Sequence, residues 1–129
     1  MATRSFIALK HLDDTFSGVY CHWDGYPEYN GKILRDDYTD RNKIVDLLDG
    51  GDISSLKTDH DWDRNPMPTG VLYYADRGDD AAVQHFQSVV DLEDTARGMG
   101  CDYLYVYDES KWICEDLSNS DFIPLATVA

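Results

Sequence analysis

The hydrophobic and polar positions of the chain change period several times, and each change predicts an element. Two β-rich runs, residues 4–10 and 16–23, are joined by the turn-like HLDDT and predict a β-hairpin. In the second run Val19, Cys21 and Trp23 fall on one face of the strand. We expect these three side chains to point inward, toward the core.

Apolar residues at helical spacing predict three helices, over residues 29–37, 40–49 and 88–98. Asp40, or the threonine before it, is expected to cap the second helix, which a Gly-Gly pair then stops. Ser88 opens a Ser-x-x-Asp pattern that resembles a capping box and predicts the start of the third. Between the last two helices DISSL is expected to form a turn.

Further strands are predicted at residues 71–75 and in a closing hairpin, 101–107 with 111–117, across the turn DESK. In the closing hairpin three alternate tyrosines share one face and aliphatic side chains share the other. This alternation predicts that the outer face of the sheet is aromatic and partly exposed.

The element order ββααβαββ and the short connections favour the α+β class. We expect a mostly antiparallel five-stranded sheet with the helices packed on one face. The length suits a single domain over residues 1–129, with the tail 118–129 loosely packed.

The net charge says more about possible binding partners than the overall composition does. Lys and Arg number 11 against 25 Asp and Glu, which gives a formal net charge of −14. Such a chain repels nucleic acid and anionic lipid, so direct binding to either is not expected. A partner protein with a basic surface suits the charge, since short carboxylates can imitate a phosphate backbone. The acidity could equally serve only solubility.

Three cysteines without a C-x-x-C spacing argue against a disulfide framework or a zinc knuckle, and for a reducing compartment. The N-terminus lacks the apolar stretch of a signal peptide, and no apolar run reaches the length of a membrane span. A cytoplasmic protein is therefore expected.

The stretch CHWDGYP, residues 21–27, combines metal-capable and aromatic side chains. Adjacent Cys21 and His22 on a strand point to opposite faces, so they cannot easily share a metal ion. We interpret the stretch as a structural corner whose exposed side is a contact surface formed by His22, Asp24 and Tyr26.

Two acidic loops are candidate binding sites. Asp59, Asp61 and Asp63 resemble the opening of a calcium loop, but Arg64 and Gly70 stand where that loop needs Gly and Glu. A solvated loop is therefore favoured over an ion site.

The second loop is the turn DRGDD, residues 76–80. Here Arg77 either pairs internally with neighbouring carboxylates such as Asp79 or is presented to a ligand.

No motif of a nucleophile, a zinc protease or a phosphate-binding loop occurs, and the four histidines show no recognisable spacing. We therefore predict no catalytic residues, no metal and no cofactor. A cryptic enzyme stays open, because catalytic partners meet in space rather than in sequence.

The blocks MATRS, VYCHWDGYPEYNGKIL, GDISSL, DRGDD and DYLYVYDESKW resemble a family of small proteins encoded by tailed phages and prophages. The resemblance covers most of the chain to about Cys114, and the long second block is its most specific part. The family has no established activity, so the resemblance implies an accessory protein inside the infected cell and carries no catalytic residues over. Residues 57–70 and the tail after Leu117 match least.

These observations predict a non-enzymatic phage accessory protein in the cytoplasm of the infected host. It is expected to bind and inhibit or modulate a host protein with a basic surface, such as a nuclease, a CRISPR or restriction component, or the transcription machinery. The alternatives are a small-ligand (nucleotide-like) binder that uses a CHWDGYP/DRGDD pocket, and a small hydrolase on that pocket. The predicted binding residues are His22, Asp24, Tyr26, Asp36, Asp37, Asp59, Asp61, Asp63, Arg77 and Asp79.

Overall fold

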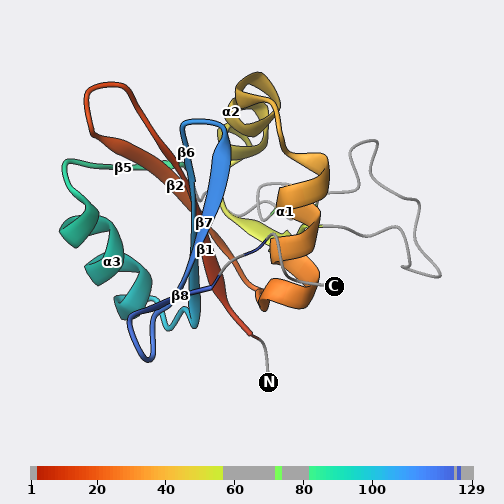
Figure 1. The fold of residues 1–129 in the computed structure, drawn as a ribbon, viewed down its shortest axis with the longest axis vertical. Helices are drawn as coiled ribbons and strands as arrows, with labels where there is room; N and C mark the ends of the chain where they lie inside the picture. Colours follow the sequence, from red (N-terminus) through yellow and green to blue (C-terminus); the bar gives the residue numbers. More distant parts are fainter. Residues whose placement is uncertain (1–2, 57–71, 74–81, 124, 126–129) are drawn as a thin grey trace.

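The computed structural model describes residues 3–56, 72–73, 82–123 and 125. The strands are β1 (Ser5–Lys10), β2 (Phe16–Cys21), β3 (Ile53–Ser55), β4 (Leu72–Tyr73), β5 (Gln84–Phe86), β6 (Tyr103–Asp108), β7 (Lys111–Asp116) and β8 (Asp121–Ile123). The helices are the π-helical turn η1 (Pro27–Gly31), α1 (Lys32–Asp37), α2 (Arg41–Asp49) and α3 (Val89–Gly98). The chain is α+β, and the described strands share one sheet (Figure 1).

The sheet is mixed, with the strand order β4-β3-β2-β1-β6-β7-β8 and with β5 also paired to β2. The hairpins β1–β2 and β6–β7 are antiparallel, as predicted. However, β1 and β6 at the centre run parallel, and so do β2 and β3. Most pairings are antiparallel, as predicted, but the prediction of a five-stranded sheet is wrong in strand number and did not include the parallel central pairing. It assumed that strands close in sequence are neighbours in the sheet.

Helices cover both faces of the sheet, which corrects the prediction of one covered face. Figure 1 shows α1 and α2 on one side and α3 on the other. In β1, Ile7 and Leu9 join the core beneath α1 and α2, while Phe6 and Ala8 join the core beneath α3. The uninterrupted apolar run Phe-Ile-Ala-Leu is typical of a strand buried on both faces, and it was the local signal for this arrangement.

The predicted helices are confirmed almost to the residue, because their boundaries are set by local chemistry. The Asp40 carboxylate accepts a hydrogen bond from the Asn42 amide at the start of α2. The Ser88 hydroxyl accepts one from the Asp91 amide at the start of α3. Each side chain satisfies an amide that has no partner within its own helix.

Two of the three tyrosines of β6 are buried and Tyr103 is half-buried, so the prediction of an outer, partly exposed aromatic face is wrong for most of this face. Tyr105 is 0% exposed and Tyr107 5% exposed, and both point toward the α1–α2 layer. Their hydroxyls donate to the carbonyl oxygens of Gly25 and Thr39. A tyrosine tolerates such burial when its hydroxyl finds an acceptor.

Three short strands were not predicted. The DISSL segment holds β3 rather than only a turn, and β5 and β8 lie in segments that sequence analysis left unassigned. Within the tail, β8 pairs with β7, and Leu125 is buried. Strands of three residues carry too few side chains to show a period, so tertiary pairing decides them.

Candidate functional site

The CHWDGYP corner is largely structural, as predicted, with one exception. Val19 and Cys21 are fully buried, but Trp23 is 45% exposed, so its predicted inward position is wrong. The strand ends at Cys21, two residues before Trp23, so the alternation of strand faces no longer holds at that position. The chain then turns at Asp24, whose φ is 58°. The Trp23 ring then packs edge-on against the His22 ring, with 4.8 Å between their centroids.

Buried polar contacts hold the corner in place. The Asn30 amide donates to the Trp23 carbonyl at 3.1 Å and to the Cys21 sulfur at 3.4 Å. The Gly25 amide donates to the Thr3 carbonyl at 2.8 Å. Burial raises the pKa of the Cys21 thiol to about 12, so this sulfur stays protonated and is unsuited to nucleophilic or metal chemistry.

The described site residues from sequence analysis fall into two separate groups. The first is at the corner, where the His22 ring contacts the Tyr20 hydroxyl at 2.7 Å and the Tyr26 side chain is exposed. Asp24 is half-buried beside them.

The second group, Asp36 and Asp37, lies at the far end of α1, roughly 15 Å along the helix axis from the corner at 1.5 Å per residue. The Asp36 carboxylate pairs with Arg35 at 2.8 Å, and a hydrogen bond from that guanidinium lowers the pKa of the carboxyl. The remaining predicted residues lie outside the described ranges: Asp59, Asp61, Asp63, Arg77 and Asp79.

A groove of about 610 Å³ opens on the α3 face of the sheet. Helix α3 packs on β2 and β5, and beside it the face over β6, β7 and β8 is hollowed. Leu104 and Val106 of β6, Ile113 and Glu115 of β7, and Phe122 of β8 line this part. They come together because the strand register aligns Leu104 with Glu115 and Glu115 with Phe122.

The groove is lined by more acids than cations. The Lys10 ammonium in its lining lies 3.6 Å from Asp14 and 3.7 Å from Asp108, which also line it. Arg97 of α3 is outside the lining, but its guanidinium lies 3.6 Å from the Glu115 carboxylate and 3.2 Å from the Ser120 hydroxyl.

Glu115 is the most perturbed acid of the groove. It is 5% exposed, and burial, then a hydrogen bond to the Glu93 carboxyl and the charge of that carboxyl, raise the pKa of Glu115 to about 7. The Arg97 guanidinium partly offsets this effect. A buried carboxyl with a raised pKa beside a second carboxyl, inside a cavity, is an arrangement found at functional sites.

The rim of the groove is apolar and exposed. Phe122 of β8 is 68% exposed and Val89 of α3 is 47% exposed, and both line the groove. Large apolar side chains exposed at a concave surface are typical of an interaction site.

Sequence analysis did not identify this groove. Its residues come from β1, α3 and the C-terminal strands, and no motif links them. One local signal existed: alternation in KWICED places Glu115 on the same face as Ile113, which is unusual for an acid.

The structure also brings together a hydrogen-bond chain of four residues. The guanidinium of Arg41 can only donate, so Nδ1 of His11, at 3.4 Å, accepts, and the proton of this ring lies on Nε2. Nε2 then donates to the Ser17 hydroxyl at 2.7 Å, and this hydroxyl donates to Nδ1 of His85 at 3.0 Å. Ser17 is only 7% exposed and engaged on both sides, so the chain joins β2, β5 and α2 rather than forming a reactive centre.

The described residues hold neither a metal-ligand cluster nor a membrane-spanning helix. No group of three or more His, Cys, Asp or Glu side chains is placed there to hold a metal ion. Within the same ranges, none of the helices has the length and apolar character needed to cross a membrane.

Comparison with models of protein families, with curated proteins and with solved structures finds no match to this chain.

Proposed function

We propose that this chain is a small acidic accessory protein that docks a basic partner protein in the groove between α3 and β8. The observation that carries the proposal is the groove itself, which combines an apolar floor and exposed apolar side chains with several lining acids, among them the buried Glu115. Apolar contacts supply most of the affinity at such a site, and the charges select the partner. Docking inhibits or modulates the partner by covering its basic surface.

The charge of the groove supports a basic partner. Lys10 in its lining and Arg97 beside it are already engaged with acids of the groove. The acids outnumber them, and the chain as a whole carries −14. A field of this sign accelerates the approach of a basic surface and repels an acidic one.

The resemblance to proteins of tailed phages supports a host protein as the partner. Host nucleases and transcription proteins carry basic surfaces for nucleic acid, which an acidic protein can occupy. The exposed carboxylates of Asp36 and Asp37, on the other face of the sheet, contribute to long-range attraction in this proposal.

The test compares matched variants on the two faces of the molecule. Phe122→Asp and Val89→Asp each place a charge on the groove rim. The control Val45→Asp places a charge at an exposed apolar position of α2, on the opposite face of the sheet. The immobilised proteins are exposed to bacterial lysate, and the partner retained by wild type is purified and titrated against each variant.

The proposal expects both rim variants to weaken binding of the purified partner by tenfold or more, and Val45→Asp to leave it unchanged. Equal binding by all three variants would remove the groove as the docking surface.

A small ligand is the second candidate, because 610 Å³ lies within the usual range of ligand pockets. In this second candidate the ligand binds in the groove and not in the predicted corner pocket, half of which lies outside the described residues. Salt distinguishes the two: docking of a basic protein weakens steeply from low to high salt, whereas an uncharged ligand in the groove responds little.

A further inference from the structure

The short strand β5 is fastened to the sheet by side chains as well as by its backbone. It is three residues long and, among the described strands, pairs with β2 alone. Its middle residue, His85, stands directly opposite Ser17, and the Ser17 hydroxyl bonds Nδ1 of His85 at 3.0 Å. A ladder of this length has few backbone hydrogen bonds, so the side-chain bond is a large share of what holds β5 in place.

The position of β5 also sets one wall of the groove. Phe86, the residue after His85, lies on the opposite face of the strand, where it is 6% exposed and belongs to the core beneath α3. Residues 87–89 follow directly, line the groove and lead into α3 (Figure 1). Because no residue separates Phe86 from this wall, a displacement of β5 moves the wall as well.

Both histidines of the hydrogen-bond chain are neutral in the observed arrangement. Nδ1 of His11 accepts from the Arg41 guanidinium at 3.4 Å, and Nε2 of the same ring donates to the Ser17 hydroxyl at 2.7 Å. That hydroxyl donates onward to Nδ1 of His85, which therefore carries no proton. The direction of the chain is fixed at its start, because a guanidinium has no acceptor.

A proton added to either ring nitrogen Nδ1 breaks the chain. On His11 the proton would set an N–H against the Arg41 guanidinium, so that donor faces donor and charge faces like charge. On His85 the proton would face the Ser17 O–H, which then loses its acceptor although Ser17 is only 7% exposed. Each of these protons therefore costs the chain one hydrogen bond.

Few charged groups act on the two rings. From α2, Arg41 opposes protonation of His11 by direct contact, and from the β1–β2 turn the Asp13 carboxylate favours it. The ammonium of Lys10, at the end of β1, is paired with Asp14 of the same turn, while β2 and β5 contain no acidic or basic residue besides the histidine itself. Within the described part of the chain neither imidazole pairs with a carboxylate, so no ion pair replaces the hydrogen bond that protonation removes.

We propose that His11, Ser17 and His85 form a pH-sensitive histidine latch, which holds β5 and the groove wall in place while both rings are neutral and releases them when either ring takes up a proton. Histidine is the side chain that ordinarily changes charge between pH 5 and 8, so acidification within this range opens the latch. The consequence for the partner rests on the proposed docking function: a groove with a displaced wall binds the basic partner less tightly at acid pH.

The latch is measured without a partner, by amide hydrogen exchange of residues 84–87 at pH 7.5 and pH 5.5, with each rate divided by the intrinsic rate at that pH. Wild type is compared with the double variant that carries His11→Gln and His85→Asn, whose side-chain amides stand where Nε2 and Nδ1 stood and do not titrate. Ser17→Ala breaks the chain at both pH values. His22→Asn is the control for a histidine outside the chain.

The proposal expects the wild-type protection of these amides to fall roughly fivefold or more from pH 7.5 to pH 5.5, the equivalent of one lost hydrogen bond, while the amides of β6 stay unchanged. The double variant should keep high protection at both pH values, Ser17→Ala should have low protection at both, and His22→Asn should show the wild-type fall. In wild type at pH 7.5, nitrogen NMR should find the proton of the His11 ring on Nε2.

Equal wild-type protection at the two pH values would overturn the latch, and so would a fall that persists in Ser17→Ala or in the double variant. A proton on Nδ1 of His11 at pH 7.5 would overturn it as well. If the double variant does not fold, the comparison of wild type with Ser17→Ala decides.

The latch and the docking function fail separately. Loss of the latch leaves docking to be judged by Phe122→Asp against Val45→Asp, and equal partner binding by those two variants removes docking while the exchange result still decides the latch. Where both hold, the purified partner should lose several-fold more affinity between pH 7.5 and pH 5.5 for wild type than for the double variant. An equal loss would detach the latch from the groove.

Discussion

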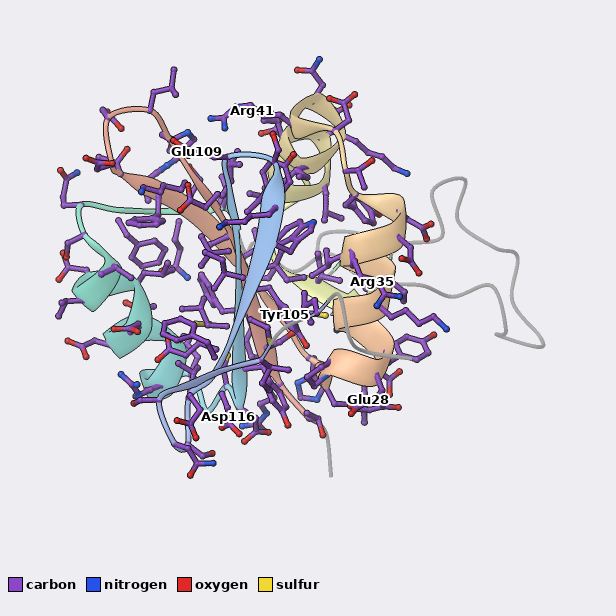
Figure 2. All side chains as sticks on the ribbon, viewed as in Figure 1. Glu28, Arg35, Arg41, Tyr105, Glu109 and Asp116 are labelled. Carbon is purple, nitrogen blue, oxygen red and sulfur yellow. The ribbon has the colours of Figure 1, made fainter. Side chains whose placement is uncertain are left out.

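The hydroxyl of Tyr105 donates a 2.6 Å hydrogen bond to the carbonyl oxygen of Gly25. The contact joins the centre of the sheet to the CHWDGYP corner, whose residues lie far away in sequence. Figure 2 shows Tyr105 in the interior, between the sheet and α1. Burial raises the pKa of this hydroxyl far above its ordinary value, so it remains a donor at any pH at which the protein is folded.

Removing this hydroxyl should destabilise the protein without changing the groove. Tyr105→Phe leaves the buried Gly25 carbonyl without its donor, at a cost of about 1–2 kcal/mol in the free energy of unfolding. Urea denaturation measures the loss. The control Tyr26→Phe, at an exposed position of the same corner, should change stability by less than about 0.5 kcal/mol. Equal losses in both variants would contradict the structural role of the Tyr105 contact.

The exposure of Trp23 predicts a small loss of stability on truncation, whereas the inward position expected from the sequence would make the loss large. Trp23→Ala should cost less than about 1 kcal/mol, since nearly half of the ring is already in water. Leu92→Ala, which truncates a fully buried side chain of α3, should cost about 2–5 kcal/mol. Thermal unfolding of the two variants side by side decides the point, and a Trp23 loss as large as that of Leu92 would place the ring in the core.

Two glycines should respond to alanine in opposite directions. At Gly18 a Cβ atom would meet the ring of Phe6 at 2.4 Å, and that ring is fully buried and cannot retreat. Gly18→Ala should therefore destabilise by about 1–3 kcal/mol. At Gly98, the last residue of α3, nothing lies within 4 Å of the added atom, so Gly98→Ala should stabilise by about 0.5–1 kcal/mol. Denaturation midpoints measure both effects.

The raised pKa of the Glu115 carboxyl predicts how the stability of the protein depends on pH. Its pKa rises from an ordinary 4.5 to about 7 in the folded protein, so the folded state binds this proton more tightly than the unfolded chain does. The protonated Glu115 carboxyl therefore adds its full contribution to the free energy of unfolding below pH 4.5. This contribution, at most about 3 kcal/mol, is lost as the pH rises to about 7. Glu115→Gln removes the loss, so it should be more stable than wild type at pH 8. The difference between the two proteins across pH 4–8 isolates this group from the other carboxyls.

Neutralising five aspartates in the first half of the chain tests how much their charge alone contributes to the rate of partner binding. The variant with Asp36, Asp37, Asp59, Asp61 and Asp63 changed to Asn should stay folded, since exposed ion pairs such as Arg35–Asp36 add little stability. It should bind the basic partner more slowly, because attraction at a distance sums over all charges and falls with salt. Stopped-flow association at low and high salt measures this. Unchanged rates at both salt concentrations would limit recognition to the groove.

Sequence analysis predicted what is decided over a few residues. The starts of α2 and α3 follow from Asp40 and Ser88, whose side chains accept hydrogen bonds from backbone amides two or three residues further along the chain. Both long hairpins follow from alternation around short turns. The burial of Cys21 likewise followed from its place on a strand face.

Tertiary structure decided what depends on distant partners. The parallel pairing of Ser5 with Tyr103 joins strands from opposite ends of the chain, and no local pattern encodes it. That pairing places β1 and β6 at the centre of the sheet, where both faces of β1 are buried. The antiparallel pairings of β6, β7 and β8 then align Leu104, Glu115 and Phe122 as the floor of the groove. A carboxyl at position 115 is an ordinary strand residue in the sequence. Its pKa is raised first because the folded chain buries it and then because Glu93 of α3 lies near it, and burial of this kind is the sum of many weak contacts that the folded chain alone assembles.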